Sequence, residues 1–104
     1  MSLAVVVTPE ADRQFAELVD WWDANRPAST TSLEDELHRV LVMLAAQPAL
    51  GRLYERRGKQ PVRHFPLRGT PYHVFYATDP RARELRVLAV WSMMRKMGPQ
   101  LPTP

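Results

Sequence analysis

The stretch VRHFPLRGTPYHVFYATDPRARELRVLAVW, residues 62–91, decides the fold that this sequence predicts. It contains three runs rich in β-branched and aromatic residues, at 62–67, 72–77 and 85–91. The turn signals RGTP and DP separate these runs, because Gly adopts φ values closed to other residues, Pro lacks a hydrogen-bond donor and Asp caps turns. The stretch therefore predicts three strands in an antiparallel meander.

The first turn also predicts which side chains share a face of the sheet. A tight turn gives three cross-strand pairs on one face: Phe65 with Val74, Arg63 with Tyr76 and Leu67 with Tyr72. This face is mostly apolar and should belong to the core. The opposite face carries a mixed set that suits an open surface: Val62, His64, Pro66, His73, Phe75 and Ala77. The run at 85–91 is apolar on both faces, which indicates a central strand.

The N-terminal part of the chain predicts one further strand and a first helix. Residues 3–7 are apolar and mostly β-branched, so they should form a short strand of the same sheet. Thr8-Pro9-Glu10 supplies a hydroxyl cap, a Pro at the first helical position and an acid, which together are a strong helix start. Asn25-Arg26-Pro27 should end this helix, because Pro disfavours the α conformation in the residue before it.

A second helix should follow, with Thr31 and Glu34 at the spacing of a capping box and an end at Gln47-Pro48. Both helices carry apolar stripes: Ala11, Phe15, Leu18, Val19 and Trp22 in the first, and Leu33, Leu37, Val40, Leu41 and Leu44 in the second. Their short linker predicts an antiparallel hairpin that covers the apolar face of the sheet. The expected fold is α+β, with an antiparallel sheet of about four strands and the hairpin on one face.

Length and composition predict a single soluble domain. The chain has 104 residues, of which 45% are hydrophobic and 24% are charged, as in ordinary globular proteins. We expect one domain at 1–98 and a flexible, Pro-rich tail at 99–104. The sequence has no Cys, its longest apolar run (40–46) is too short to span a bilayer, and residues 4–7 lack the length and basic flank of a signal peptide. These features favour a cytoplasmic protein without a membrane partner.

The net charge of +3 conceals an uneven distribution. Residues 1–50 hold eight acidic and three basic side chains, whereas residues 51–104 hold three acidic and eleven basic ones. Such polarity favours an anionic partner, either nucleic acid or an acidic protein segment, although a small domain also needs surface charge for solubility.

The connection at 49–61 is the most basic part of the chain and should be a loop. It carries Arg52, Arg56, Arg57 and Lys59, with Glu55 as its single acid. Such a loop either holds phosphate oxygens or is a solvated linker whose charges protect the sheet edge from aggregation.

Several short pieces occur in a characteristic order: TPEA at 8–11, NRPA at 25–28, PALGR at 48–52, VRHFPL at 62–67, YHVFY at 72–76, and LAVW at 88–91 followed by Arg95. In this order they resemble the RelE/ParE superfamily of type II toxin-antitoxin toxins. The resemblance implies a bacterial plasmid-stabilization toxin that needs no cofactor and inhibits growth until a cognate antitoxin binds it, with a toxin-antitoxin hetero-oligomer as a possible assembly. RelE-branch toxins cut messenger RNA in the ribosomal A site, whereas ParE-branch toxins poison DNA gyrase.

The two branches differ in the chemistry that they require. Metal-free RNA cleavage needs a base, an acid and cations at the phosphate, and the candidates for these roles are His64, His73, Arg68 and Arg95. Ser92-Met93-Met94 stands where ribonucleases of the superfamily often carry His, Tyr or Arg, and this departure favours the gyrase-binding branch. We assign no metal site, because two histidines and no Cys do not make one.

Three functions remain open: a gyrase-binding toxin, which we prefer, a ribosome-dependent endoribonuclease, and a protein that has lost toxicity and only binds an antitoxin. The basic side chains are candidates for binding nucleic acid or a partner protein: Arg52, Arg56, Arg57, Lys59, Arg68 and Arg95. Met93, Met94 and Met97 either fill gaps against the sheet or contact a partner.

Overall fold

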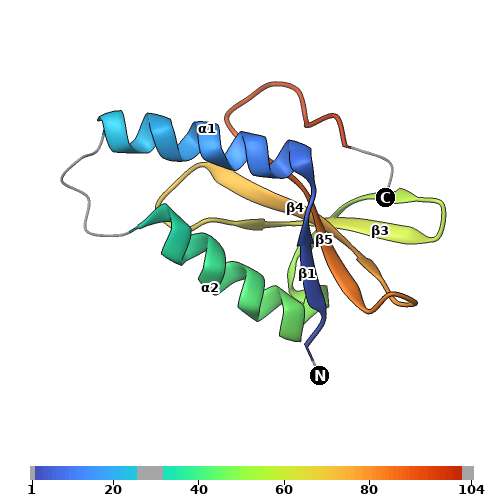
Figure 1. Cartoon of the computed structure of the whole chain (residues 1–104). Coiled ribbons are helices and arrows are strands. Elements are labelled where there is room, and N and C mark those ends of the chain that lie inside the picture. The colour runs from blue at the N-terminus through green and yellow to red at the C-terminus, as the bar shows by residue number, and fades with distance from the viewer. Residues whose placement is uncertain (1, 26–31, 102–104) are drawn as a thin grey trace.

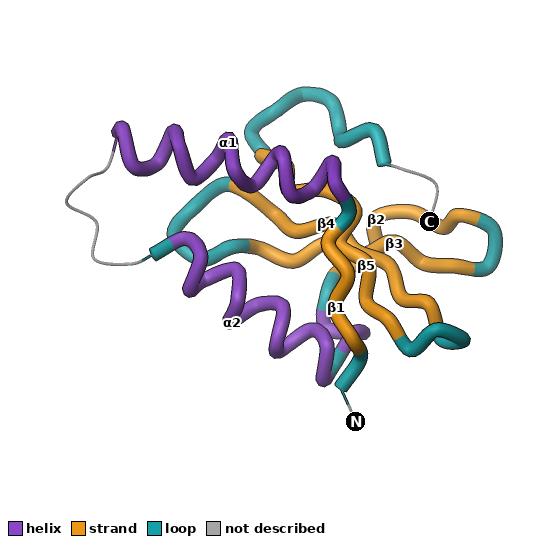
Figure 2. Tube along the Cα trace, in the orientation of Figure 1, coloured by secondary structure: helices purple, strands orange, loops and turns teal. Residues whose placement is uncertain are grey.

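The computed structural model describes residues 2–25 and 32–101 and shows a twisted sheet with two helices on one face (Figures 1 and 2). The elements are β1 (Ala4–Val7), α1 (Pro9–Asn25), α2 (Leu33–Ala46), a 3₁₀ turn (Pro48–Leu50), β2 (Arg52–Arg57), β3 (Gln60–Pro66), β4 (Tyr72–Asp79) and β5 (Glu84–Ser92). The strand order is β1-β5-β4-β3-β2. Strands β2 to β5 pair antiparallel, and β1 runs parallel to β5. The predicted α+β class is confirmed.

The meander has the predicted register. Phe65 lies opposite Val74 and Arg63 opposite Tyr76, and the backbone N–H of Leu67 donates to the carbonyl of Tyr72 at 2.9 Å. The turn requires glycine, because Gly69 has a φ of +82°. Strand β5 lies between β1 and β4, as expected of a central strand.

The expectation of a basic loop at 49–61 is wrong, because residues 52–57 form the edge strand β2. Arg57 pairs with Gln60, so β2 and β3 are joined by a two-residue turn in which Gly58 has a φ of +62°. The described sheet therefore has five strands rather than about four. A bulge between Leu53 and Glu55 and the charged side chains of β2 protect this edge from pairing with other chains.

Both helices begin with side-chain caps. The Oγ1 of Thr8 accepts a hydrogen bond from the N–H of Ala11 at 3.3 Å and donates to the carbonyl of Val87 at 2.8 Å, which ties the start of α1 to β5. Ser32 caps α2 by accepting from the N–H of Asp35 at 3.3 Å. Thr31, the first residue of the predicted capping box, and residues 26–27 lie outside the described residues.

The hairpin covers the predicted apolar face of the sheet. Residues of both helices, of β4 and β5 and of the turn after β3 form this core: Ala11, Leu18, Leu33, Val40, Leu44, Leu67, Val74, Tyr76, Leu85, Val87 and Val90. None of the described helices is long and apolar enough to cross a membrane.

Glu36 is a buried carboxylate that joins α2 to the turn between β3 and β4. Its oxygens accept from the guanidinium of Arg39 at 2.8 and 2.9 Å and from the backbone N–H of Arg68 at 2.5 Å. The bonds with Arg39 in particular lower the pKa of Glu36 although burial opposes ionisation. A buried charge is tolerated here because it is fully paired.

The face of the sheet opposite the helices, called the second face below, is half covered rather than open as expected. Residues 93–101 turn back after β5, and Leu101 packs with Val62, Phe75, Ala77, Leu88 and Ala89. The indole of Trp91 donates to the carbonyl of Met97 at 2.9 Å, and Arg57 donates to the carbonyl of Leu101 at 3.1 Å. Part of the segment expected to be a flexible tail is thus buried, at Pro99 and Leu101.

Candidate functional site

A row of basic and aromatic side chains crosses the part of the second face next to the turn between β3 and β4. Arg52 on β2 lies opposite His64 on β3, and His73 on β4 lies opposite Trp91 on β5. His64 and His73 are diagonal neighbours, as the sequence predicted. The guanidinium carbon of Arg95 lies 4.3 Å from the centre of the Trp91 ring. We call these five residues the basic row.

The two histidines of the basic row contact each other directly. Their rings stack with centroids 5.0 Å apart, and the two Nδ1 atoms are 2.8 Å apart. Only one proton fits between these nitrogens, so one ring donates and the other accepts.

The surroundings of this pair favour the uncharged rings. Burial lowers the pKa of His64, and the positive charge of Arg52 lowers it further. Burial also lowers the pKa of His73, and the neighbouring His64 lowers it further. The pair is therefore mostly neutral at pH 7.

Tyr54 supports the pair from β2. Its ring stands edge-on to His64, with centroids 6.2 Å apart, and to Phe75, at 4.9 Å. Sequence reasoning assigned no role to Tyr54 or Trp91, since it placed Tyr54 in a loop and did not foresee that Arg95 would stack on Trp91.

Two cations of the basic row lack an acidic partner. Within residues 2–25 and 32–101, no carboxylate forms a salt bridge with Arg52 or Arg95. Both side chains are exposed and can bind an anion.

The other predicted basic residues lie apart from the row. Arg57 pairs with Glu55 at 3.0 Å, and Arg56 and Lys59 are exposed near the far end of the β2–β3 hairpin. Arg68 lies on the α2 side of the next turn, 3.8 Å from Glu36. The structure thus brings together Arg52, His64, His73 and Arg95 of the predicted site residues. In the described part of the chain, no three His, Cys, Asp or Glu side chains are grouped as metal ligands.

A family model described as the ParE toxin of type II toxin-antitoxin systems, parDE, matches residues 5–97. The chain belongs to this toxin family. The match extends from β1 past the end of β5, and it confirms the resemblance to the RelE/ParE superfamily. A comparison with curated proteins finds no match.

Membership of the ParE toxin family implies an antitoxin as a partner of this chain. The basic row of this ParE-family toxin offers two chemical capacities: anion binding by the two arginines and the holding of one proton between the two histidines. Neither capacity by itself defines a reaction.

The histidine pair predicts that stability decreases in mild acid. The folded state lowers both pKa values below the unfolded value of about 6.5, so the unfolded chain binds protons first as the pH falls. The free energy of unfolding should be constant above about pH 7 and fall below it, by at most about 1.4 kcal/mol per pH unit for each histidine. Urea denaturation between pH 5 and 8 measures this slope.

His73→Gln should flatten this pH dependence, because it removes one of the two rings of the pair and the contact between the two Nδ1 atoms. An identical slope in wild type and His73→Gln would contradict the role of the pair.

Proposed function

We propose that this toxin inhibits DNA gyrase by binding it, without cleaving nucleic acid, and that an antitoxin bound to the toxin prevents this. In this proposal the toxin acts in the cytoplasm, where gyrase and its DNA are found. The observation that carries the proposal is the match to the ParE toxin family over residues 5–97. Of the two branches of the superfamily, the ParE branch is the one that acts on gyrase.

The state of the histidine pair is consistent with a toxin that acts by binding. The Nδ1 atoms of His64 and His73 are 2.8 Å apart and bind each other, and the pKa values of both rings are lowered. A general acid needs a protonated group near the operating pH, and a mostly neutral pair serves poorly in that role. Ser92 ends β5 and Met93 and Met94 follow it, and none of these side chains can act as the general acid instead.

One observation favours a second candidate, a metal-independent endoribonuclease. The basic row places two histidines and two arginines on one surface, and neither arginine has a carboxylate partner in the described part of the chain. RNA cleavage needs cations at the phosphate and groups that move protons. In this alternative, one of His64 and His73 would accept the proton of the attacking 2′-hydroxyl and the other would give a proton to the leaving 5′-oxygen, while Arg52 and Arg95 would stabilise the charge on the phosphate.

Two assays on purified toxin, freed from its antitoxin, distinguish the candidates. In the first, gyrase supercoils a relaxed plasmid, and we expect the toxin to inhibit this reaction. In the second, translating ribosomes are incubated with the toxin, and primer extension should reveal no new messenger RNA ends. Discrete cuts in the A site that vanish with His73→Ala would overturn the gyrase proposal. Inactivity in both assays would indicate a protein that only binds an antitoxin.

Arg95→Ala should weaken the inhibition of gyrase, because Arg95 is an exposed arginine stacked on an aromatic ring, a typical anchor at protein interfaces. We expect the half-inhibitory concentration to rise about fivefold or more. Arg81→Ala is the matched control, since Arg81 is also exposed but lies in the turn between β4 and β5. Equal effects of the two substitutions would argue for nonspecific attraction of charge.

A further inference from the structure

The two edges of the sheet are built differently. Strand β2 carries charged side chains and a bulge, which keep its open side from pairing with other chains. Strand β1 at the opposite edge has neither, because its sequence is AVVV and its register with β5 has no interruption. Residues 2–9 carry no charged side chain at all. The shortness of β1 is therefore its main protection against a further strand.

The outer side of β1 presents backbone groups to solvent (Figure 1). The N–H of Ala4 donates to the carbonyl of Arg83 at 3.0 Å, and the N–H of Thr8 donates to the carbonyl of Val87 at 3.1 Å. Because successive residues of a strand direct their N–H and C=O groups to opposite sides, those of Val5 and Val7 point away from β5. In the described sheet no strand lies beyond β1, so a further strand could bind these groups.

The side chains of this edge are apolar and only partly covered. Val5 and Val7 lie beside the core residues Leu85 and Val87, on the face that the helices cover. They nevertheless remain 39% and 40% exposed, since the sheet ends there. Val6 points to the second face and is half-buried. A strand added at this edge would bury apolar surface on both faces.

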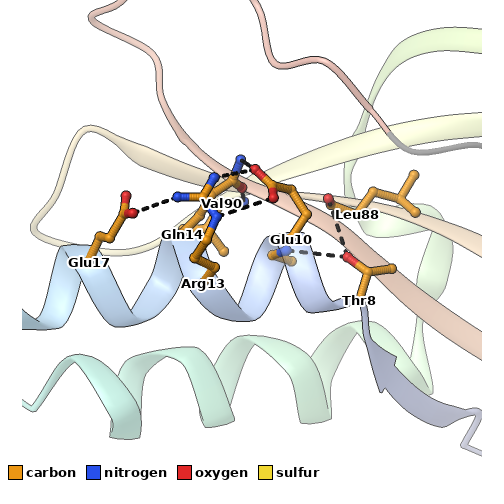
Figure 3. Close-up of polar contacts among 8 residues, drawn as sticks. Thr8, Glu10, Arg13, Gln14, Glu17, Leu88 and Val90 are labelled. Atoms are coloured by element: carbon orange, nitrogen blue, oxygen red, sulfur yellow. Dashed lines mark hydrogen bonds and ion pairs between the residues drawn. The ribbon is translucent and has the colours of Figure 1, made fainter.

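The charged residues around β1 are paired within the chain. Figure 3 shows that Arg13, near the start of α1, lies between Glu10 and Glu17 and pairs with both. On β5, Glu84 and Arg86 lie opposite residues of β1 and pair with each other at 3.2 Å. None of these charges would be left without a partner if a second strand came to lie against β1.

We propose that two copies of this chain pair through β1, with the strands antiparallel about a two-fold axis at Val6. Val5 then lies opposite Val7 of the partner subunit, and each such pair exchanges both of its N–H···O bonds. The strand suits its own copy because identical open groups and identical side chains stand on either side of Val6.

This pairing keeps both copies of the basic row on one side of the assembly. Side chains that lie opposite each other in antiparallel strands point to the same face, so the two sheets join into one with a common second face. The pairing does not depend on the proposed action on gyrase. Because a four-residue strand buries far less than the roughly 1,000 Å² of a stable interface, the dimer should be weak and reversible.

Sedimentation of the full-length toxin, freed from its antitoxin, measures this equilibrium. The mass should rise from monomer towards dimer between about 1 and 500 μM, with a dissociation constant of about 10–100 μM. Val5→Pro should abolish the dimer, because it removes an N–H that binds nothing within the described sheet, and an edge strand tolerates Pro at such a position. Val5→Lys should weaken the dimer about tenfold or more. Leu53→Lys is the matched control on the other edge, where Leu53 is 47% exposed, and should have less than about a twofold effect.

A second measurement tests the register and does not depend on how Val5→Pro folds. The chain has no Cys. At the two-fold axis the two Cα atoms of position 6 should be about 4.5 Å apart, which a disulfide can bridge. Copper-phenanthroline should therefore link Val6→Cys into a covalent dimer on a non-reducing gel. Ala4→Cys, on the same face, should stay monomeric because its partner would lie roughly 13 Å away.

Each outcome supports or overturns the pairing. A wild-type toxin that stays monomeric at every concentration would overturn it, whether or not the toxin inhibits gyrase. A dimer that persists in both Val5→Pro and Val5→Lys would assign the contact to another surface. Equal linking of Ala4→Cys and Val6→Cys would contradict the antiparallel register. A dimer that is lost in the Val5 variants and linked only at position 6 would establish the pairing even if gyrase is not the target.

Discussion

Gly51→Ala should lower the free energy of unfolding by about 3 kcal/mol or more, through overpacking and two lost hydrogen bonds. A Cβ at position 51 would lie 2.4 Å from the hydroxyl oxygen of Tyr76 and 2.8 Å from its Cε1 atom. The Tyr76 side chain is only 1% exposed, so it has no free space into which to move. Gly51 has a φ of −68°, which alanine adopts freely, so the effect is steric and not a matter of backbone strain.

The hydrogen bonds that Gly51→Ala would break connect three segments of the chain. The N–H of Gly51 donates to the Tyr76 hydroxyl at 2.9 Å, and this hydroxyl donates to the carbonyl of Pro48 at 2.6 Å. Arg63 donates to the carbonyl of Gly51 at 3.0 Å. Since Arg52 is the next residue, Gly51→Ala should also displace the first member of the basic row.

A double-mutant cycle with Tyr76→Phe tests this interpretation by urea denaturation. Tyr76→Phe alone should cost about 1–3 kcal/mol, because it leaves the buried N–H of Gly51 without its partner. The double variant should lose less than the sum of the two single losses, since the closest contact, at 2.4 Å, is gone. A loss below about 1 kcal/mol for Gly51→Ala would mean that the backbone moves away from Tyr76 at little cost.

The meander could be predicted from the sequence because its determinants are local. RGTP at 68–71 sets the turn, the turn sets the register, and a period of two then assigns every side chain to a face. The cap at Thr8 and the end of α2 at Gln47 were predictable for the same reason.

Strand β2 was missed because its own sequence lacks the alternation of a strand, although its partner β3 follows after a two-residue turn. Its sequence RLYERR has four charged residues in six, and a bulge interrupts its alternation. Charged side chains are tolerated in a strand at the edge of a sheet, where water reaches them, so composition does not distinguish such a strand from a basic loop. The local signal that could have found it is Gly58, which lies in the two-residue turn between β2 and β3. The cover of the second face was missed likewise, because it depends on Leu101 reaching back to Val62 and Phe75.

The candidate site was predictable in outline only. Register placed His64 and His73 on one diagonal, but their contact at 2.8 Å depends on rotamers that no sequence pattern specifies. Glu36 could have been noticed, since it lies three residues after Leu33 and four before Val40 and so falls on the apolar stripe of α2. A charge at such a position indicates a buried partner.

Leu44→Ala should destabilise the fold by about 2–5 kcal/mol, the usual cost of removing a large buried side chain from a packed core. The sequence treats the apolar residues of α2 alike, but the structure separates them: Val40 and Leu44 are fully buried, whereas Leu37 and Leu41 are only partly so. Leu44 packs in the core between the hairpin and the sheet. Removing it leaves a cavity where α2 covers the sheet, so the loss should appear as a lower urea midpoint with an unchanged slope.

Val42→Ala is the matched control, two residues away on the same helix. Val42 is 55% exposed, so its truncation should change stability by no more than about 0.5 kcal/mol. Both changes end in alanine, and Val42→Ala gains more helix propensity than Leu44→Ala because valine is the poorer helix former, so a loss confined to Leu44→Ala reports burial. Equal losses at the two positions would mean that burial of Leu44 against the sheet contributes nothing to stability. The hairpin would then be a detachable element instead of part of the core beneath the sheet that carries the basic row.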